Sequence, residues 1–128
     1  MFSNASLSSV GQCSYIRLIH KDRSISCHLL MAKSKVAPSK PITVPRLELK
    51  AAVLSIKVGD MLSRELEYEN MESIYWTDST AVLGYISNDS KRFHTFVCNR
   101  VETIGSSTTP DQWHYVPSLE NPADIASR

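Results

Sequence analysis

Three acidic side chains occupy positions from which a fold could bring them together. Glu48 opens a long segment with an apolar stripe, Asp78 directly follows a short apolar run, and Asp124 lies near the end of the chain. Residues that follow strands or open helices gather at the carboxyl edge of a sheet. Carboxylates gathered there repel one another unless divalent cations neutralise them, and their oxygen atoms suit Mg²⁺ or Mn²⁺. Two such ions roughly 4 Å apart support phosphodiester hydrolysis.

Each of these acids also has a purely structural explanation. Asp78 together with Ser79 could cap the helix that follows, and the helix dipole favours any acid in a first turn, as at Glu48 and Asp124. His114 alternates within a predicted strand, which is typical of a structural residue. Spacing alone does not decide between the two explanations.

Basic residues precede and open the same long segment: Lys33, Lys35, Lys40, Arg46 and Lys50. They either form a solvated loop or contact phosphates. The whole chain carries 14 Lys and Arg against 13 Asp and Glu, a formal net charge of +1. This balance excludes a polybasic nucleic-acid tail but leaves room for a local basic face.

The 128 residues, 42% hydrophobic and 21% charged, predict one globular domain over residues 1–128 and exclude a disordered chain. No apolar run approaches the roughly 18 residues of a membrane span, and residues 1–10 do not resemble a signal peptide. We therefore expect a cytoplasmic protein without a membrane partner. Three cysteines without C-x-x-C spacing favour neither disulfides nor zinc.

Hydrophobic patterning predicts the elements of the first half of the chain. Alternation favours strands at 15–19 and 24–31 joined as a hairpin, and residues 1–6 favour a short strand before them. Residues 32–44, rich in Pro and Lys, are expected to form a loop. Pro45 then opens a helix whose apolar residues recur at i, i+4, i+7 and i+11, and this helix ends near residues 68–70.

The second half alternates short strands and helices. We expect strands at 74–76 and 113–116, helices at 81–86 and 93–104, a loop at 87–92, and a break at 105–110. Asn121 can cap a final helix that has Pro122 at its first position. The order β-β-β-α-β-α-α-β-α predicts an α/β fold in which helices pack on a mixed sheet.

Four sequence segments carry a resemblance to a known family, in order and at suitable intervals: 44–52 (VPRLELKAA), 75–80 (YWTDST), 92–101 (from Arg-Phe to Asn-Arg-Val) and 121–128 (NPADIASR). They resemble the ribonuclease H-like segment of BEL/Pao-type LTR retrotransposon polyproteins, which lies between reverse transcriptase and integrase. The resemblance covers essentially the whole chain and is strongest from Val36 onward. It implies a ribonuclease H-like five-stranded mixed sheet of order 3-2-1-4-5, with helices on both faces.

The resemblance also implies an activity, the endonucleolytic cleavage of RNA in RNA–DNA hybrids by a two-ion Mg²⁺ or Mn²⁺ site. Carried over by motif, Glu48, Asp78 and Asp124 are the catalytic and metal-binding residues. RNA selectivity would come from contacts to the 2′-hydroxyl. The expected nucleic-acid contacts are Lys33, Lys35, Lys40, Arg46, Ser79, Lys91 and Arg92.

The chain departs from the family pattern in its first strand. The family places an aspartate in a Phe-x-Asp-Ala-Ser segment, where this chain has Asn4 within residues 2–6 (FSNAS). Asparagine offers a neutral oxygen, so two cations would lose one of four carboxylates, and we predict an inactive or weakened nuclease. The loop histidine common before the last aspartate is also missing. The chain begins inside the expected central strand and ends early in the last helix, so we expect a domain truncated at both ends.

Three functions remain open from the sequence. The first is a ribonuclease H-like enzyme impaired by Asn4. The second is a non-catalytic module that binds nucleic acid through the basic residues. The third is a structural segment that only contacts the reverse transcriptase and integrase segments of the same polyprotein.

Overall fold

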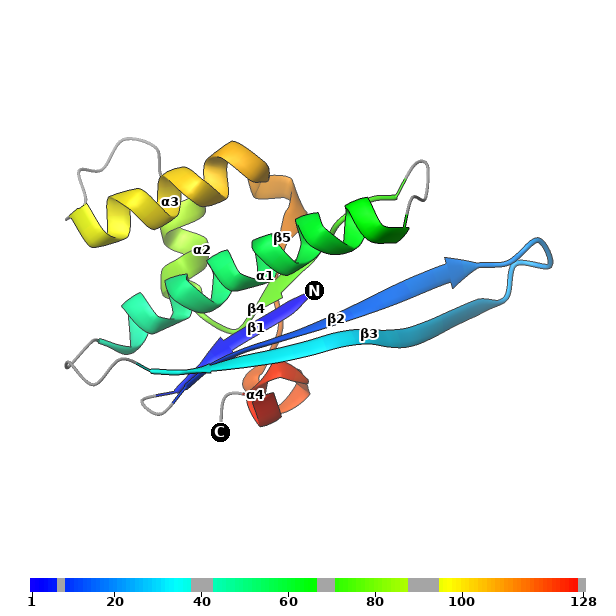
Figure 1. The fold of residues 1–128 in the computed structure, drawn as a ribbon, viewed down its shortest axis with the longest axis horizontal. Helices are drawn as coiled ribbons and strands as arrows, with labels where there is room; N and C mark the ends of the chain where they lie inside the picture. Colours follow the sequence, from blue (N-terminus) through cyan, green and yellow to red (C-terminus); the bar gives the residue numbers. More distant parts are fainter. Residues whose placement is uncertain (7–8, 38–42, 67–70, 88–94, 127–128) are drawn as a thin grey trace.

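The computed structural model describes residues 1–6, 9–37, 43–66, 71–87 and 95–126, and the side chains of 95–98 and 125–126 lie outside that description. Five strands and four α-helices follow the predicted order (Figure 1). Their bounds are β1 Phe2–Ala5, β2 Ser9–Ile19, β3 Ile25–Val36, α1 Val44–Leu66, β4 Tyr75–Thr77, α2 Thr80–Ser87, α3 Thr95–Ser107, β5 Trp113–Tyr115 and α4 Ala123–Ala126. Short 3₁₀ turns at Pro110–Gln112 and Ser118–Glu120 flank β5.

The strands form one mixed sheet of order β3-β2-β1-β4-β5, which confirms the predicted topology. β1 lies at its centre, antiparallel to β2 and parallel to β4. β5 is parallel to β4, and β3 completes a long antiparallel hairpin with β2. The carboxyl ends of β1 and β4 therefore meet at one edge of the sheet, where Asn4 lies near the end of β1 and Asp78 follows β4.

Helix α1 supplies most of the core. Pro45 lies in its first turn, as predicted, and its apolar stripe buries Leu47, Leu49 and Ile56 almost completely. One cluster joins this stripe to Tyr75, Trp113 and other residues, and a second joins it to Val10 and its neighbours on β1 and β2. Burial of this stripe against the sheet fixes the N-terminal part of α1, where Glu48 lies in the second turn rather than in the first turn expected from the sequence.

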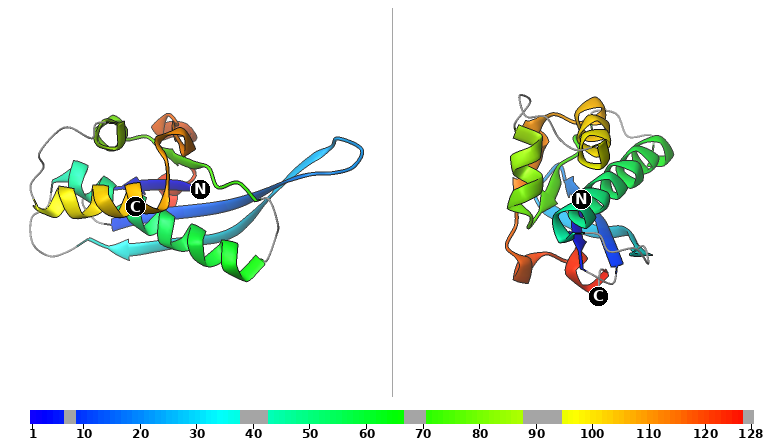
Figure 2. Two further views of the ribbon diagram at one scale, coloured as in Figure 1. Left: turned by 90° about the horizontal axis from the view of Figure 1, so that it is seen from above. Right: turned by 90° about the vertical axis from the view of Figure 1, so that its left-hand side faces the viewer.

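The helices cover both faces of the sheet, as expected. α1 packs against β1 and β2, and α2 and α3 lie against α1 on the same side. α4 contacts β1, β2 and β3 from the opposite side (Figure 2). The long β2–β3 hairpin extends well beyond both layers of helices (Figure 1).

Three sequence-based boundaries are wrong. β2 begins at Ser9 rather than at residue 15, because residues 9–14 pair with β3. Residues 32–36 belong to β3 rather than to a loop, because they pair with residues 9–13 of β2. α3 continues through Gly105 to Ser107, past the predicted break, and a Cβ at Gly105 would meet open space. Most of the predicted 87–92 loop, the start of the 93–104 helix and the predicted helix end at 68–70 lie outside the described residues.

β1 is much shorter than its neighbour β2. Its ladder with β2 runs from the Phe2–Cys13 pair to the Ala5–Val10 pair, and in the described residues β2 beyond Cys13 pairs with β3 alone.

The tip of the hairpin turns at Arg23, whose positive φ of 68° lies in the left-handed region.

Among the described residues, no helix combines the length and apolar character needed to cross a bilayer. Cys13 is buried and Cys27 is exposed, and both are free thiols. Burial raises the pKa of the Cys13 thiol, which donates to the Pro122 carbonyl at 3.6 Å.

Gly59 lies where α1 packs closely against Met1 and Tyr75. A Cβ there would lie 2.5 Å from the Met1 sulfur and 2.9 Å from the Tyr75 hydroxyl, and the buried Tyr75 ring stacks on Trp113. We expect Gly59→Ala to lower the free energy of unfolding by about 1–2 kcal/mol, since the clash outweighs the gain in helix propensity. Gly84→Ala, which would meet no atom within 4 Å in α2, should stabilise the protein slightly. Urea unfolding of both variants measures this; a Gly59→Ala protein at least as stable as wild type would contradict it.

Candidate active site

The structure brings the predicted acids to one cleft. Asn4 at the end of β1, Glu48 in α1, Asp78 after β4 and Asp124 in α4 all line a cleft of about 390 Å³. Ser79, a predicted nucleic-acid contact, lines it as well. Glu48, Asp78 and Asp124 are separated by 30 and 46 residues in the sequence. They converge here because β1 and β4 are adjacent parallel strands and because α1 and α4 both pack against β1.

Glu48 is buried in the wall of the cleft. Burial, followed by repulsion from Asp78, raises the pKa of the Glu48 carboxyl from 4.5 to about 8, although the Ala5 backbone N–H donates to it and opposes the rise. Its Oε2 atom has no hydrogen-bond partner among the described residues. A buried carboxylate oxygen without a donor is costly, so this position favours a proton or a cation.

The two residues that follow β4, Asp78 and Ser79, make different contacts. The Ser79 hydroxyl caps α2 by accepting from the Val82 N–H at 3.2 Å. The Asp78 carboxylate instead accepts from the Ser118 hydroxyl at 2.9 Å. Ser79 therefore performs the capping that the sequence left open, and Asp78 lies in the cleft opposite Glu48. Ser118 also lines the cleft, although no local pattern around it predicts this.

Asn4 contacts Asp124 directly. Its amide nitrogen donates to the Asp124 carboxylate at 3.0 Å, across 120 residues of sequence. This amide orientation follows from chemistry, because the amide oxygen would repel a carboxylate. The asparagine that replaces the expected aspartate is therefore a hydrogen-bond donor to another predicted metal ligand.

Asn121 fixes α4 to the central strand. Its side-chain amide donates to the Ser3 carbonyl at 2.9 Å, and its oxygen accepts from the Ala123 N–H at 3.0 Å. The second contact confirms the predicted cap, whereas the first was not predicted. Together they set the position of Asp124 relative to Asn4.

The donor set suits a hard cation only in part. Carboxylate oxygens around a cleft with one unpartnered buried oxygen are the chemistry that Mg²⁺ and Mn²⁺ prefer. Yet among the described residues no three His, Cys, Asp or Glu side chains form a group that could hold one ion. The arrangement thus offers two coupled acids, Glu48 and Asp78, and a third acid that is engaged with Asn4.

The predicted basic contacts are spread over different elements. Lys33 and Lys35 are exposed on β3, and Arg46 is half-buried in the first turn of α1. Lys40, Lys91 and Arg92 lie outside the described residues. His114 is exposed on β5 and packs against the Trp76 ring at 5.0 Å between centroids, which agrees with a structural role.

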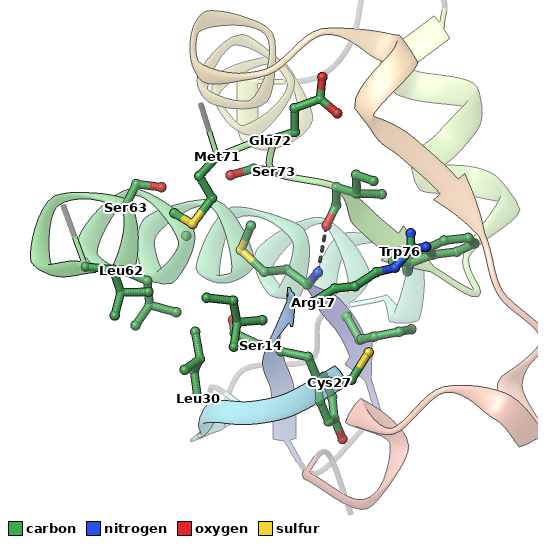
Figure 3. Close-up of a pocket in the computed structure, with 17 residues that line it drawn as sticks. Ser14, Arg17, Cys27, Leu30, Leu62, Ser63, Met71, Glu72, Ser73 and Trp76 are labelled. Carbon is green, nitrogen blue, oxygen red and sulfur yellow. Dashed lines mark hydrogen bonds between the residues drawn. The ribbon is translucent and has the colours of Figure 1, made fainter. Parts of the chain in front are cut away.

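A second, more apolar pocket of about 310 Å³ lies at the opposite end of β1 (Figure 3). Arg17 reaches toward Trp76 there, and the α-amino group of Met1 donates to the Ile74 carbonyl at 2.6 Å. Burial lowers the pKa of this amine to about 6. The pocket contains none of the predicted site residues.

Replacing Glu48 by glutamine should stabilise the metal-free protein at alkaline pH. With its pKa raised, folded Glu48 retains a proton that the unfolded chain releases, so its contribution to stability is present below pH 4.5 and is lost as the pH rises to about 8. We expect the advantage of Glu48→Gln over wild type to grow across that window to about 2–5 kcal/mol. Urea unfolding in EDTA between pH 4 and 9 measures it.

Glu65→Gln, at an exposed position of the same helix, is the matched control and should show no comparable trend. A stability difference between Glu48→Gln and wild type that does not change with pH would show that folding does not raise the pKa of the Glu48 carboxyl.

Comparison with known proteins agrees with this geometry. Residues 1–79 match the family described as the Pao retrotransposon-like RNaseH-like domain. The matched region covers more than half of the 128 residues and includes Asn4, Glu48 and Asp78, but not Asp124. No curated protein matched the chain. The five-stranded mixed sheet has the ribonuclease H-like topology expected from the sequence. The chain therefore belongs to the Pao retrotransposon-like ribonuclease H-like domain family.

Proposed function

We propose that this domain binds RNA–DNA hybrids at the carboxylate cleft and that Asn4 strongly weakens their Mg²⁺-dependent cleavage. The ancestral activity would be endonucleolytic hydrolysis of the RNA strand. The observation that carries the proposal is the hydrogen bond from Asn4 to Asp124 in the cleft that also holds Glu48 and Asp78.

The charge at position 4 decides whether the cleft needs a cation. An aspartate there would lie about 3 Å from the Asp124 carboxylate, and two ionised acids at that separation require a cation or a shared proton. Asparagine donates a hydrogen bond instead and leaves Asp124 satisfied without metal. The substitution therefore removes one ligand charge and also holds a second ligand in a metal-free arrangement.

Glu48 and Asp78 are the residues that would hold Mg²⁺ or Mn²⁺, since the unpartnered Oε2 atom of Glu48 is available to a cation. Asp124 would join them only after leaving Asn4. Two ions bound in this way would supply the charge that activates water and stabilises the leaving oxygen. The protein's part is to hold the carboxylates of Glu48 on α1, Asp78 after β4 and Asp124 on α4, and to orient the hybrid.

A second candidate is a non-catalytic nucleic-acid-binding module. The Asn4–Asp124 hydrogen bond favours it too, because it stabilises the cleft without metal. The two candidates differ in whether any hydrolysis remains. A purely structural segment of a polyprotein, the third candidate, would bind no hybrid at low salt.

Asn4→Asp should restore cleavage. We expect the variant to cut the RNA strand of a hybrid in Mg²⁺ at least about 100-fold faster than wild type, because it returns the missing ligand charge. Gel analysis of end-labelled hybrid measures the rates. Adding Asp78→Asn to Asn4→Asp is the control for contaminating nuclease and should abolish the gain. Equal rates for wild type and Asn4→Asp would overturn the assignment of position 4.

The same substitution should make stability depend on metal. In EDTA we expect Asn4→Asp to melt roughly 5 °C below wild type, since it loses the hydrogen bond and gains repulsion from Asp124. Mg²⁺ should raise its melting temperature more than that of wild type. Asn99→Asp, an identical change at an exposed site on α3, controls for net charge. If Mg²⁺ shifts all three proteins equally, position 4 does not face a cation site.

A further inference from the structure

A cavity continues the line of β1 beyond its first residue. This pocket of about 310 Å³ lies between residues 14–17 of β2 and residues 71–74, and the C-terminal half of α1 forms one of its walls (Figure 3). The backbone of Met1 still pairs as a strand, because its nitrogen donates to the Ile74 carbonyl and its carbonyl accepts from the Trp76 N–H at 2.7 Å. The cavity therefore occupies the track that a longer central strand would follow, beside an edge of β2 that pairs with no other described residue.

The β2–β3 hairpin exposes apolar side chains next to this cavity. Ile19, Ile25 and Leu29 are 71%, 53% and 57% exposed, and Tyr15 is 40% exposed. These four side chains share one face of the hairpin, because Tyr15 is paired with Leu29 and Ile19 with Ile25. A two-stranded ribbon is marginally stable in water, and a third strand stabilises it. The hairpin thus offers both an open edge and an apolar surface to an added strand.

The charges around the cavity favour an acidic residue beside β2. Arg17 is exposed and reaches toward Trp76 (Figure 3). It makes no ion pair with another described residue. Glu72 is the one acid among the described residues that line the cavity, and it comes from the opposite wall. A carboxylate on an added strand, opposite Arg17, would therefore meet an unpaired positive charge.

The existing ladder determines which side chains of an added strand face which way. β1 pairs Phe2 with Cys13 and runs antiparallel to β2, so a strand that continues its line would lie opposite residues 15–19. Ile16 and Leu18 are half-buried, whereas the residues that alternate with them are exposed, because Ile16 and Leu18 lie on the same face of β2 as Val10, which packs against α1. Residues of the strand opposite Ile16 and Leu18 would therefore face α1, and a residue opposite Arg17 would face away from it.

We propose that the open edge of β2 binds an extended peptide segment of a partner protein as an added antiparallel strand, with an acidic residue opposite Arg17 and apolar residues on the α1 side. Main-chain hydrogen bonds hold such a strand, and its alternate side chains provide selectivity. A second copy of the chain fits less well, because antiparallel pairing of two β2 edges brings the Arg17 side chains of both copies close together. The site is separate from the carboxylate cleft, so its failure would leave the proposed function intact.

A labelled peptide of sequence Thr-Val-Glu-Leu-Thr tests the proposal. Its glutamate would lie opposite Arg17, and its valine and leucine would face α1. Fluorescence anisotropy with the whole chain measures its affinity. We expect wild type to bind it roughly threefold to fivefold more tightly than the same peptide with lysine in place of glutamate. Arg17→Glu should reverse this order of affinities, and the fold should be retained because the side chain is exposed.

Lys21→Glu is the matched control, since it makes the same charge reversal at an exposed position at the far tip of the β2–β3 hairpin. We expect it to leave the preference for the glutamate peptide unreversed. Hydrogen exchange locates the bound peptide, which should slow exchange of amides within residues 14–19 but not within residues 9–13. The proposal is wrong if wild type binds neither peptide, if Arg17→Glu keeps the wild-type preference, or if binding slows no amide within residues 14–19.

Discussion

The four residues of β1 are the constraint on which the cleft depends. This strand pairs with β2 on one side and β4 on the other, so it fixes where the acid after β4 lies. The Ala5 N–H donates to the Glu48 carboxylate, the Ser3 carbonyl anchors Asn121, and the Asn4 amide contacts Asp124. Each element that carries a predicted acid is therefore positioned by the backbone of β1 or by one of its side chains.

The charges in the cleft are balanced unevenly. Glu48 is buried near Asp78, and its Oε2 atom lacks a partner among the described residues. A negative charge on Glu48 is therefore not compensated in this half of the cleft. Asp124 is instead stabilised by a neutral amide. Under the proposed function, asparagine rather than aspartate at position 4 removes the repulsion of Asp124 that a second cation would otherwise neutralise, while the fold that assembles the cleft is retained.

Much of the architecture was predictable because it depends on local patterns. The apolar stripe of α1, the opening Pro45 and the cap at Asn121 are signals within single segments. The end of β3 was not predictable in this way, since its Lys-rich residues form a strand only through pairing with β2. Contacts between distant segments, such as Ser118 with Asp78 or Asn121 with the Ser3 carbonyl, have no local signal either. The motif resemblance predicted that Glu48, Asp78 and Asp124 share one site. That Asn4 donates a hydrogen bond to Asp124 could be seen only in the folded structure.

The Asn4 amide donates a hydrogen bond to Asp124, and we propose that this contact keeps Asp124 from binding a cation. A crystal structure of the wild-type domain grown with Mn²⁺ tests it most directly, because the anomalous signal locates each ion. We predict that the Asn4–Asp124 hydrogen bond persists and that any ion lies between Glu48 and Asp78. Two ions, one of them bound jointly by Asn4 and Asp124, would contradict it.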